Sequence, residues 1–134
     1  MPKEYFNPRE LFPSQQYGFS QVIATDGKRT VYLSGQVAWN AQQEMEHPLD
    51  LGAQARRALE NLETGVKAAG GTRADVVSMR IYVVGEHIHN TVPVREALLE
   101  FFPRDQLPTS TWIGVSALAN KDFLIEIEAI AVLQ

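Results

Sequence analysis

The stretch Leu107–Val115 (LPTSTWIGV), followed by Leu124–Val132 (LIEIEAIAV), is the most informative part of this chain for its fold. Both segments are dominated by β-branched and aliphatic residues, which favour strands. Successive side chains of a strand point to opposite faces, so Glu126 and Glu128 share one face of the second strand. We expect the two strands to bring Glu126 next to a polar turn.

Three more strands are predicted before these two, over Phe19–Thr25, Thr30–Gln36 and Val76–Val84. Asp26-Gly27 separates the first two strands and indicates a hairpin turn between them.

Two helices are predicted over Asp50–Ala69 and Asn90–Phe102. In the first, apolar residues recur at helical spacing, Asp50 is the expected N-cap and Gly70-Gly71 ends the helix. Pro93 is compatible with the first turn of the second helix.

The order strand, strand, helix, strand, helix, strand, strand predicts an α+β fold with a mixed sheet and two helices on one face. The last strand carries Ile130 and Val132 on the same face as its glutamates, so neither face is fully polar. We therefore expect the second face of the sheet to be buried in an oligomer. The sequence shows no repeat or linker, which predicts a single domain over residues 1–134.

Composition narrows the class of protein. The 134 residues carry a formal net charge of −4 and scattered basic residues, which argues against a nucleic-acid partner. The chain has no cysteine, so disulfides and thiolate chemistry are excluded. Neither a signal peptide nor a membrane span is indicated, and we expect a cytoplasmic protein that does not interact with membranes.

Several short motifs have two possible interpretations. Glu126 and Glu128 are either a general acid/base at a subunit interface or solvated side chains on an open sheet face. The tripeptide Ser34-Gly35-Gln36 either offers a backbone N–H to a ligand or simply ends a strand. Ser110 and Thr111 lack a recognisable base and elbow motif, so a pocket-lining role is expected rather than a nucleophile.

His87-Ile88-His89 resembles a metal-ligand pair, but no third ligand follows at a recognisable spacing. A solvated loop is the preferred interpretation, and no metal site is predicted.

The chain resembles the reactive intermediate deaminase family, also called the RidA or YjgF family and labelled endoribonuclease L-PSP. The resemblance extends from Phe19 to Val132 in matching order and spacing. The matching pieces include Val31–Gln36, Ala58–Leu62, Ala68–Gly71, Asp75–Val77, Phe101–Pro103 and the two segments quoted first.

This resemblance implies a chorismate-mutase-like fold and a homotrimer in which the sheets form a central barrel. It also implies three equivalent clefts, each between neighbouring subunits and each binding a small molecule. The implied activity is hydrolysis of reactive imines and enamines to a carbonyl compound and ammonia, without a cofactor or metal.

The resemblance also implies roles for individual residues. Glu126 corresponds to the carboxylate that holds or activates the attacking water. Gly35 and Trp112 correspond to positions whose backbone groups contact the ligand, and Phe19 replaces a tyrosine that lines the cleft. Neighbouring Ser34 and Thr111 complete the expected ligand-binding residues.

Ser110 stands where deaminating members carry an arginine that pairs with the substrate carboxylate. A serine hydroxyl cannot replace the charged, bidentate clamp of a guanidinium. Arg95, on the second helix, is either a partial replacement for that charge or a solvent-facing residue.

Three functions follow from these observations. The first is an imine or enamine deaminase with an altered substrate preference. The alternatives are a trimer that binds a metabolite without turning it over, and an endoribonuclease or translation inhibitor as older family labels suggest. The acidic balance of the chain argues against the last.

Overall fold

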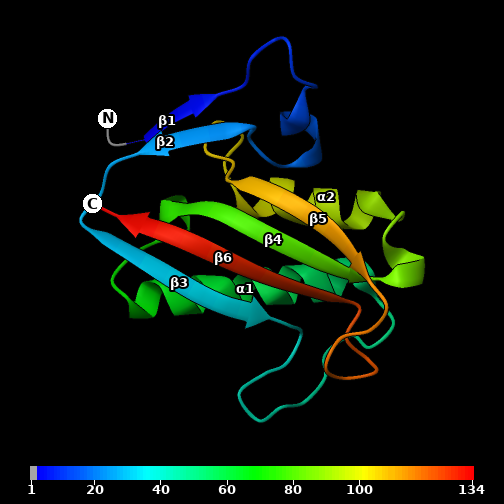
Figure 1. The fold of residues 1–134 in the computed structure, drawn as a ribbon. Helices are drawn as coiled ribbons and strands as arrows, with labels where there is room; N and C mark the ends of the chain where they lie inside the picture. The colour runs from blue at the N-terminus through cyan, green and yellow to red at the C-terminus, as the bar shows by residue number, and fades with distance from the viewer. Residues whose placement is uncertain (1–2) are drawn as a thin grey trace.

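A four-stranded mixed sheet forms the centre of the computed structural model, which describes residues 3–134 (Figure 1). Strand β6 pairs antiparallel with β3 on one side and β4 on the other, and β4 pairs parallel with β5. The strands, in spatial order, are β3 (Arg29–Gln36), β6 (Ile125–Leu133), β4 (Val76–Val84) and β5 (Thr109–Val115).

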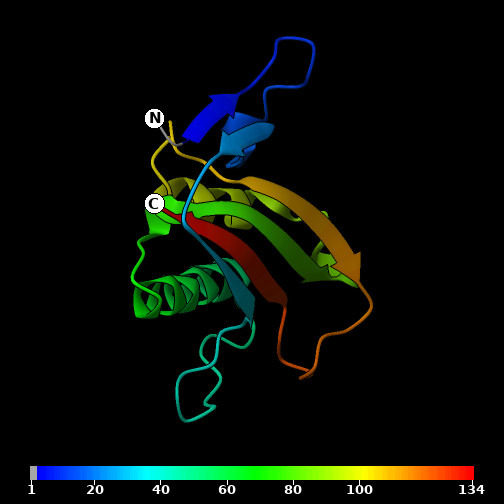
Figure 2. The same cartoon turned by 60° about the vertical axis from the view of Figure 1, so that its left-hand side comes forward.

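Two α-helices of the described chain, α1 (Leu51–Ala68) and α2 (Thr91–Phe101), cover one face of this sheet (Figure 2). Alternate residues of β6 face the helices and are buried, among them Ile125, Ile127 and Ala131. Among the described residues no helix lies over the opposite face (Figure 2), and Tyr32 on that face is 77% exposed. The predicted α+β architecture with two helices on one face is confirmed.

The predicted helix boundaries are also confirmed. The Asp50 side chain accepts a hydrogen bond from the Ala53 backbone N–H at 3.0 Å, as an N-cap does. Gly70 follows the last turn of α1 with φ of +93°, a conformation that glycine adopts without steric cost. Pro93 lies in the first turn of α2.

The predicted hairpin between residues 19–25 and 30–36 is wrong. β2 (Val22–Thr25) pairs with the N-terminal strand β1 (Lys3–Phe6) in a separate two-stranded sheet, and β3 pairs with β6 instead. A β-carbon at Gly27 would lie 2.2 Å from Val132 Cγ1. Gly27 therefore allows the chain to pass close to β6, rather than to form a tight turn.

A short 3₁₀ helix, η1 (Ser14–Tyr17), connects β1 to β2 and packs against α2. Two further 3₁₀ turns, η2 (Arg73–Asp75) and η3 (Gly85–His87), flank β4. No helix within residues 3–134 is both long enough and apolar enough to cross a membrane.

Gln54 is a fully buried polar residue that ties α1 to two loops. Its Nε2 donates to the backbone carbonyls of His47 and Asp122 at 2.9 and 3.0 Å, and its Oε1 accepts from the Leu124 N–H at 2.9 Å. Both amide N–H groups and the amide oxygen are thereby directed at backbone groups, of which the His47 carbonyl also accepts from the Asp50 N–H at 3.2 Å. Gln54 fixes the start of β6, two residues before Glu126.

Candidate functional site

Glu126 lies on the open face of the sheet, half-buried between its neighbours on β3 and β4. Tyr82 is its register partner on β4. On β3 the register shifts between Leu33 and Gln36, and Gly35 lies within this irregularity. A β-carbon at Gly35 would be 2.0 Å from Glu126 Oε2, so glycine leaves the space that the carboxylate occupies. The structure thus brings Gly35 and Glu126 together.

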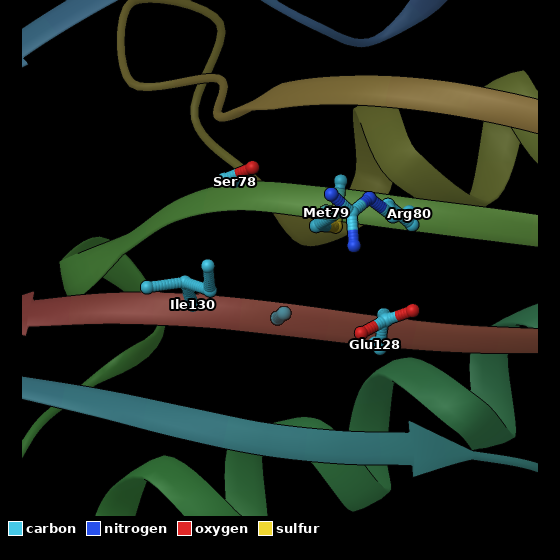
Figure 3. Close-up of a pocket in the computed structure, with 6 residues that line it drawn as sticks. Ser78, Met79, Arg80, Glu128 and Ile130 are labelled. Atoms are coloured by element: carbon cyan, nitrogen blue, oxygen red, sulfur yellow. The ribbon is translucent and has the colours of Figure 1, made fainter.

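The surroundings of Glu126 raise its pKa relative to a glutamate in water. Burial raises the pKa of Glu126 above its ordinary value, and the nearby Glu128 carboxylate raises it further. Glu128 accepts a hydrogen bond from the Tyr82 hydroxyl and is the register partner of Arg80. Figure 3 shows Arg80 and Glu128 side by side on neighbouring strands. Glu128 therefore has polar partners, whereas Glu126 faces the space above Gly35.

The raised pKa of Glu126 has a consequence for stability. Between the ordinary glutamate pKa and the raised one, the folded chain binds more protons than the unfolded chain, so this group makes stability fall as pH rises through that interval. We expect Glu126→Gln to remove this contribution. Chemical denaturation of both proteins at a series of pH values measures it, and parallel profiles would contradict the assignment.

A second group of predicted residues lies at the edge strand β5. Ser110 and Trp112 are register partners of Met79 and Ile81, which are buried beneath the helices. The Trp112 indole Nε1 donates to Ser110 Oγ at 3.1 Å. Thr111 lies between them on the opposite face and is exposed.

A polar hollow of about 260 Å³ adjoins this edge. Its walls come from three segments, residues 19–21, 78–80 and 109–111. Phe19 and Ser110 both line it, so the structure brings these two predicted residues together. Thr111, on the opposite face of β5, also lines the polar hollow.

The structure does not bring the two groups together within one chain. β4 lies between β5 and β6, and Ser110 points to the helix side while Glu126 is on the open face. The expected proximity of Glu126 to the polar turn is therefore wrong for a single chain. The reason is the parallel pairing of β4 with β5, which the sequence order did not reveal.

The remaining predicted residues lie at the margins of these groups. Ser34 is exposed near the end of β3, and its carbonyl accepts from Gln36 Nε2 at 3.2 Å. The Arg95 guanidinium lies 5.9 Å from the centre of the Tyr17 ring. Within residues 3–134, Arg95 forms no ion pair with a carboxylate.

Three relevant residues were missed from the sequence. Alternation along β4 placed Tyr82 on the same face as Arg80, but only the register with β6 reveals its contact with Glu128. Phe12 and Tyr17 lie in an irregular segment without periodicity, so no pattern predicted their packing near the β5 edge.

His87 lies in η3 beside Glu86, and residues 3–134 contain no cluster of three potential metal ligands.

The family model described as Endoribonuclease L-PSP matches residues 10–133. The chain belongs to this family. Similar solved structures are described as members of the Rid or YjgF family, which confirms the resemblance found in the sequence. The Rid protein YyfB of Yersinia pestis, a protein of unknown function, is 39% identical, with a TM-score of 0.93 over 99% of this chain and 100% of that one.

Named relatives of this Rid chain include deaminases. A 2-iminobutanoate/2-iminopropanoate deaminase from Dermatophagoides farinae is 30% identical over 92% of both chains. The putative reactive intermediate deaminase TdcF of Escherichia coli K12 is 36% identical over 76% of this chain and 78% of its own. A structure of E. coli TdcF with bound serine has a TM-score of 0.67 at 31% identity, covering 90% of this chain and 95% of that one.

Proposed function

We propose that this chain hydrolyses reactive imines or enamines to a carbonyl compound and ammonia. The observation that carries the proposal is the half-buried Glu126 carboxylate above Gly35, with a pKa raised by burial. A raised pKa brings a carboxylate closer to the range where it exchanges protons with water. The imine deaminase names of its relatives support the same reaction class.

In the proposed reaction, Glu126 holds a water molecule and accepts its proton as the oxygen attacks the imine carbon. The C=N double bond becomes a C–N single bond, and the nitrogen takes up a proton from solvent, which gives a neutral carbinolamine. Glu126 then returns its proton to the nitrogen, the C–N bond breaks to release ammonia, and the hydroxyl proton passes to solvent as the carbonyl forms. Backbone groups at Gly35 and Trp112 orient the ligand.

The proposed site is completed by a second copy of the chain. In a single chain Glu126 and Ser110 lie on opposite faces of the sheet, with β4 between their strands. A homotrimer with clefts between neighbouring subunits would place β5 of one subunit near the open sheet face of the next. The exposed Tyr32 and the neighbouring Ile130 on the open face support such a buried interface.

Ser110 is proposed to alter the preferred ligand. Its hydroxyl already accepts a hydrogen bond from the Trp112 indole, and it carries no charge. Truncating one partner of a buried charge pair typically costs about 2–5 kcal/mol. A ligand without a carboxylate, or one that holds its carboxylate elsewhere, therefore suits this site better than 2-aminoacrylate does.

Ser110→Arg is expected to restore affinity for carboxylate-bearing imines. The new guanidinium lines the polar hollow beside Phe19, and the gain in kcat/KM for 2-aminoacrylate should be about tenfold or more. Ammonia release from freshly generated imines, with and without a carboxylate, measures it. Ser110→Gln is the matched uncharged control, and an equal gain in that variant would contradict the role of charge.

Arg95 is proposed to supply part of the missing positive charge. It lies on α2 near Tyr17 and has no carboxylate partner among residues 3–134. Arg95→Gln should weaken binding of carboxylate ligands and leave uncharged ligands unaffected. The charge-dependent loss is measured by titration with both ligand types. Arg104→Gln, which removes an exposed charge from the α2–β5 loop, serves as the control.

The same imine panel tests the proposed function as a whole. Catalysed ammonia release from at least one imine is the expected result. No release from any member, together with measurable ligand binding, would instead support a metabolite-binding module. The hydrogen bond from the Trp112 indole N–H to Ser110 Oγ is the observation that favours the metabolite-binding function.

A further inference from the structure

An aromatic hollow of about 230 Å³ lies beside the β5 edge, next to the polar hollow but outside the region around Glu126. Four aromatic side chains and one threonine line it: Phe12, Tyr17, Phe19, Thr91 and Trp112. These residues come from three parts of the chain, namely the segment before β2, the first turn of α2, and β5. The lining has almost no polar surface, so an apolar group is the occupant that it suits.

The aromatic walls support one another. The Phe12 ring packs edge-on against Phe19 with centroids 6.0 Å apart, and against Tyr17 at 6.4 Å. Such tilted and edge-to-face pairs are the favoured arrangements of aromatic rings. Yet Phe12 remains 56% exposed and Tyr17 36% exposed. Exposed aromatic surface gathered around one hollow indicates a binding site rather than a folded core.

The aromatic hollow and the polar hollow share one wall residue, Phe19. The hydrogen bond from Trp112 Nε1 to Ser110 Oγ also joins a wall of one to a wall of the other. A ligand with a polar head and an apolar side chain therefore fits across the two. The polar head would lie near Ser110, and the side chain would lie among the rings.

We infer that the aromatic hollow binds the side chain of the substrate, so the substrate is an imine that bears an aromatic or bulky branched substituent. This inference rests on the proposed function and specifies its substrate class. The size is suitable, because a dry cavity of about 150 Å³ already accepts benzene. One such ring would gain edge and face contacts with the four aromatic walls.

Binding of stable carbonyl products tests this inference independently of catalysis. Four probes vary the side chain and the carboxylate separately: 2-oxobutanoate, 2-oxo-4-phenylbutanoate, butanone and 4-phenylbutan-2-one. We expect each phenyl compound to bind at least about tenfold more tightly than its partner without the ring. Equal affinities within both pairs would overturn the inference.

Trp112 provides the readout. The only other tryptophan, Trp39, packs against Phe123 with ring centroids 4.9 Å apart, away from the hollow. In a Trp39→Phe background, fluorescence therefore reports on Trp112 alone. A phenyl ligand should change this fluorescence with the same midpoint that calorimetry gives. Binding without any change in Trp112 fluorescence would place the ring elsewhere and contradict the assignment.

Phe12→Ala and Phe6→Ala form a matched pair of variants. Both phenylalanines are exposed and belong to the N-terminal segment, but only Phe12 lines the hollow. Phe12→Ala should reduce the advantage of phenyl ligands several-fold, and Phe6→Ala should preserve it. Equal effects of the two substitutions would count against the hollow.

The two proposals fail in different ways. If imines are hydrolysed but the phenyl group brings no affinity, the proposed function stands and the substrate class is wrong. If phenyl ligands bind in the hollow but no imine releases ammonia, the hollow is a binding site and the proposed reaction is wrong.

Discussion

Glu126→Gln is expected to lower the rate of imine hydrolysis by about 10² to 10⁴-fold, the usual contribution of a positioned general acid or base. Glutamine has the size of glutamate and fits the space above Gly35, so the fold should survive. It cannot accept a proton from water at neutral pH. Steady-state ammonia release measures the loss, and full activity in this variant would remove Glu126 from the mechanism.

Glu128→Gln is the matched control for this prediction. Glu128 lies two residues further along the same face of β6, where it accepts a hydrogen bond from Tyr82. Removing its charge should lower the pKa of Glu126, because Glu128 is one cause of the upward shift. We expect most activity to remain, with the acidic limb of the pH–rate profile moved to lower pH. A loss as large as that of Glu126→Gln would mean that the two carboxylates act as a pair.

Gln54→Leu is expected to lower the free energy of unfolding by about 2 kcal/mol or more. Leucine fills most of the volume but leaves the Asp122 carbonyl and the Leu124 N–H without their partner, while the His47 carbonyl keeps its bond from the Asp50 N–H. Each unsatisfied buried polar group costs about 1–3 kcal/mol. Urea denaturation measures the change. The exposed Gln16→Leu should change stability by less than about 0.5 kcal/mol, as surface substitutions usually do.

A small effect of Gln54→Leu would mean that water replaces the lost partners. A large effect with unchanged activity would mean that the start of β6 is held by other contacts. If both stability and activity fall, Gln54 also positions Glu126, which follows Leu124 by two residues.

The helices were predictable because their signals are local. Apolar spacing, the Asp50 cap and the glycine after Ala69 are each set by residues within a few turns of one another. Strand pairing depends on partners far along the chain. The Asp26-Gly27 pair satisfied a local rule for hairpins. Its glycine is needed instead because a β-carbon at this position would clash with Val132, which is more than 100 residues away in the sequence.

The candidate site was predictable only in part for the same reason. Family resemblance selected Glu126, Gly35, Ser110 and Trp112, and the structure resolves them into two groups on different strands and faces. No local pattern indicated that β4 separates β5 from β6. The aromatic hollow escaped prediction because its walls come from irregular chain, a helix start and an edge strand.

The contact between positions 35 and 126 also limits how this sequence can change over time. Because a β-carbon at position 35 would overlap the Glu126 carboxylate, a larger residue there requires the side chain at 126 to shorten or to move its carboxylate aside. The two sites are therefore epistatic, and the order of substitutions matters. A lineage that replaces the glycine first loses the carboxylate position, whereas one that loses the glutamate first no longer needs the glycine.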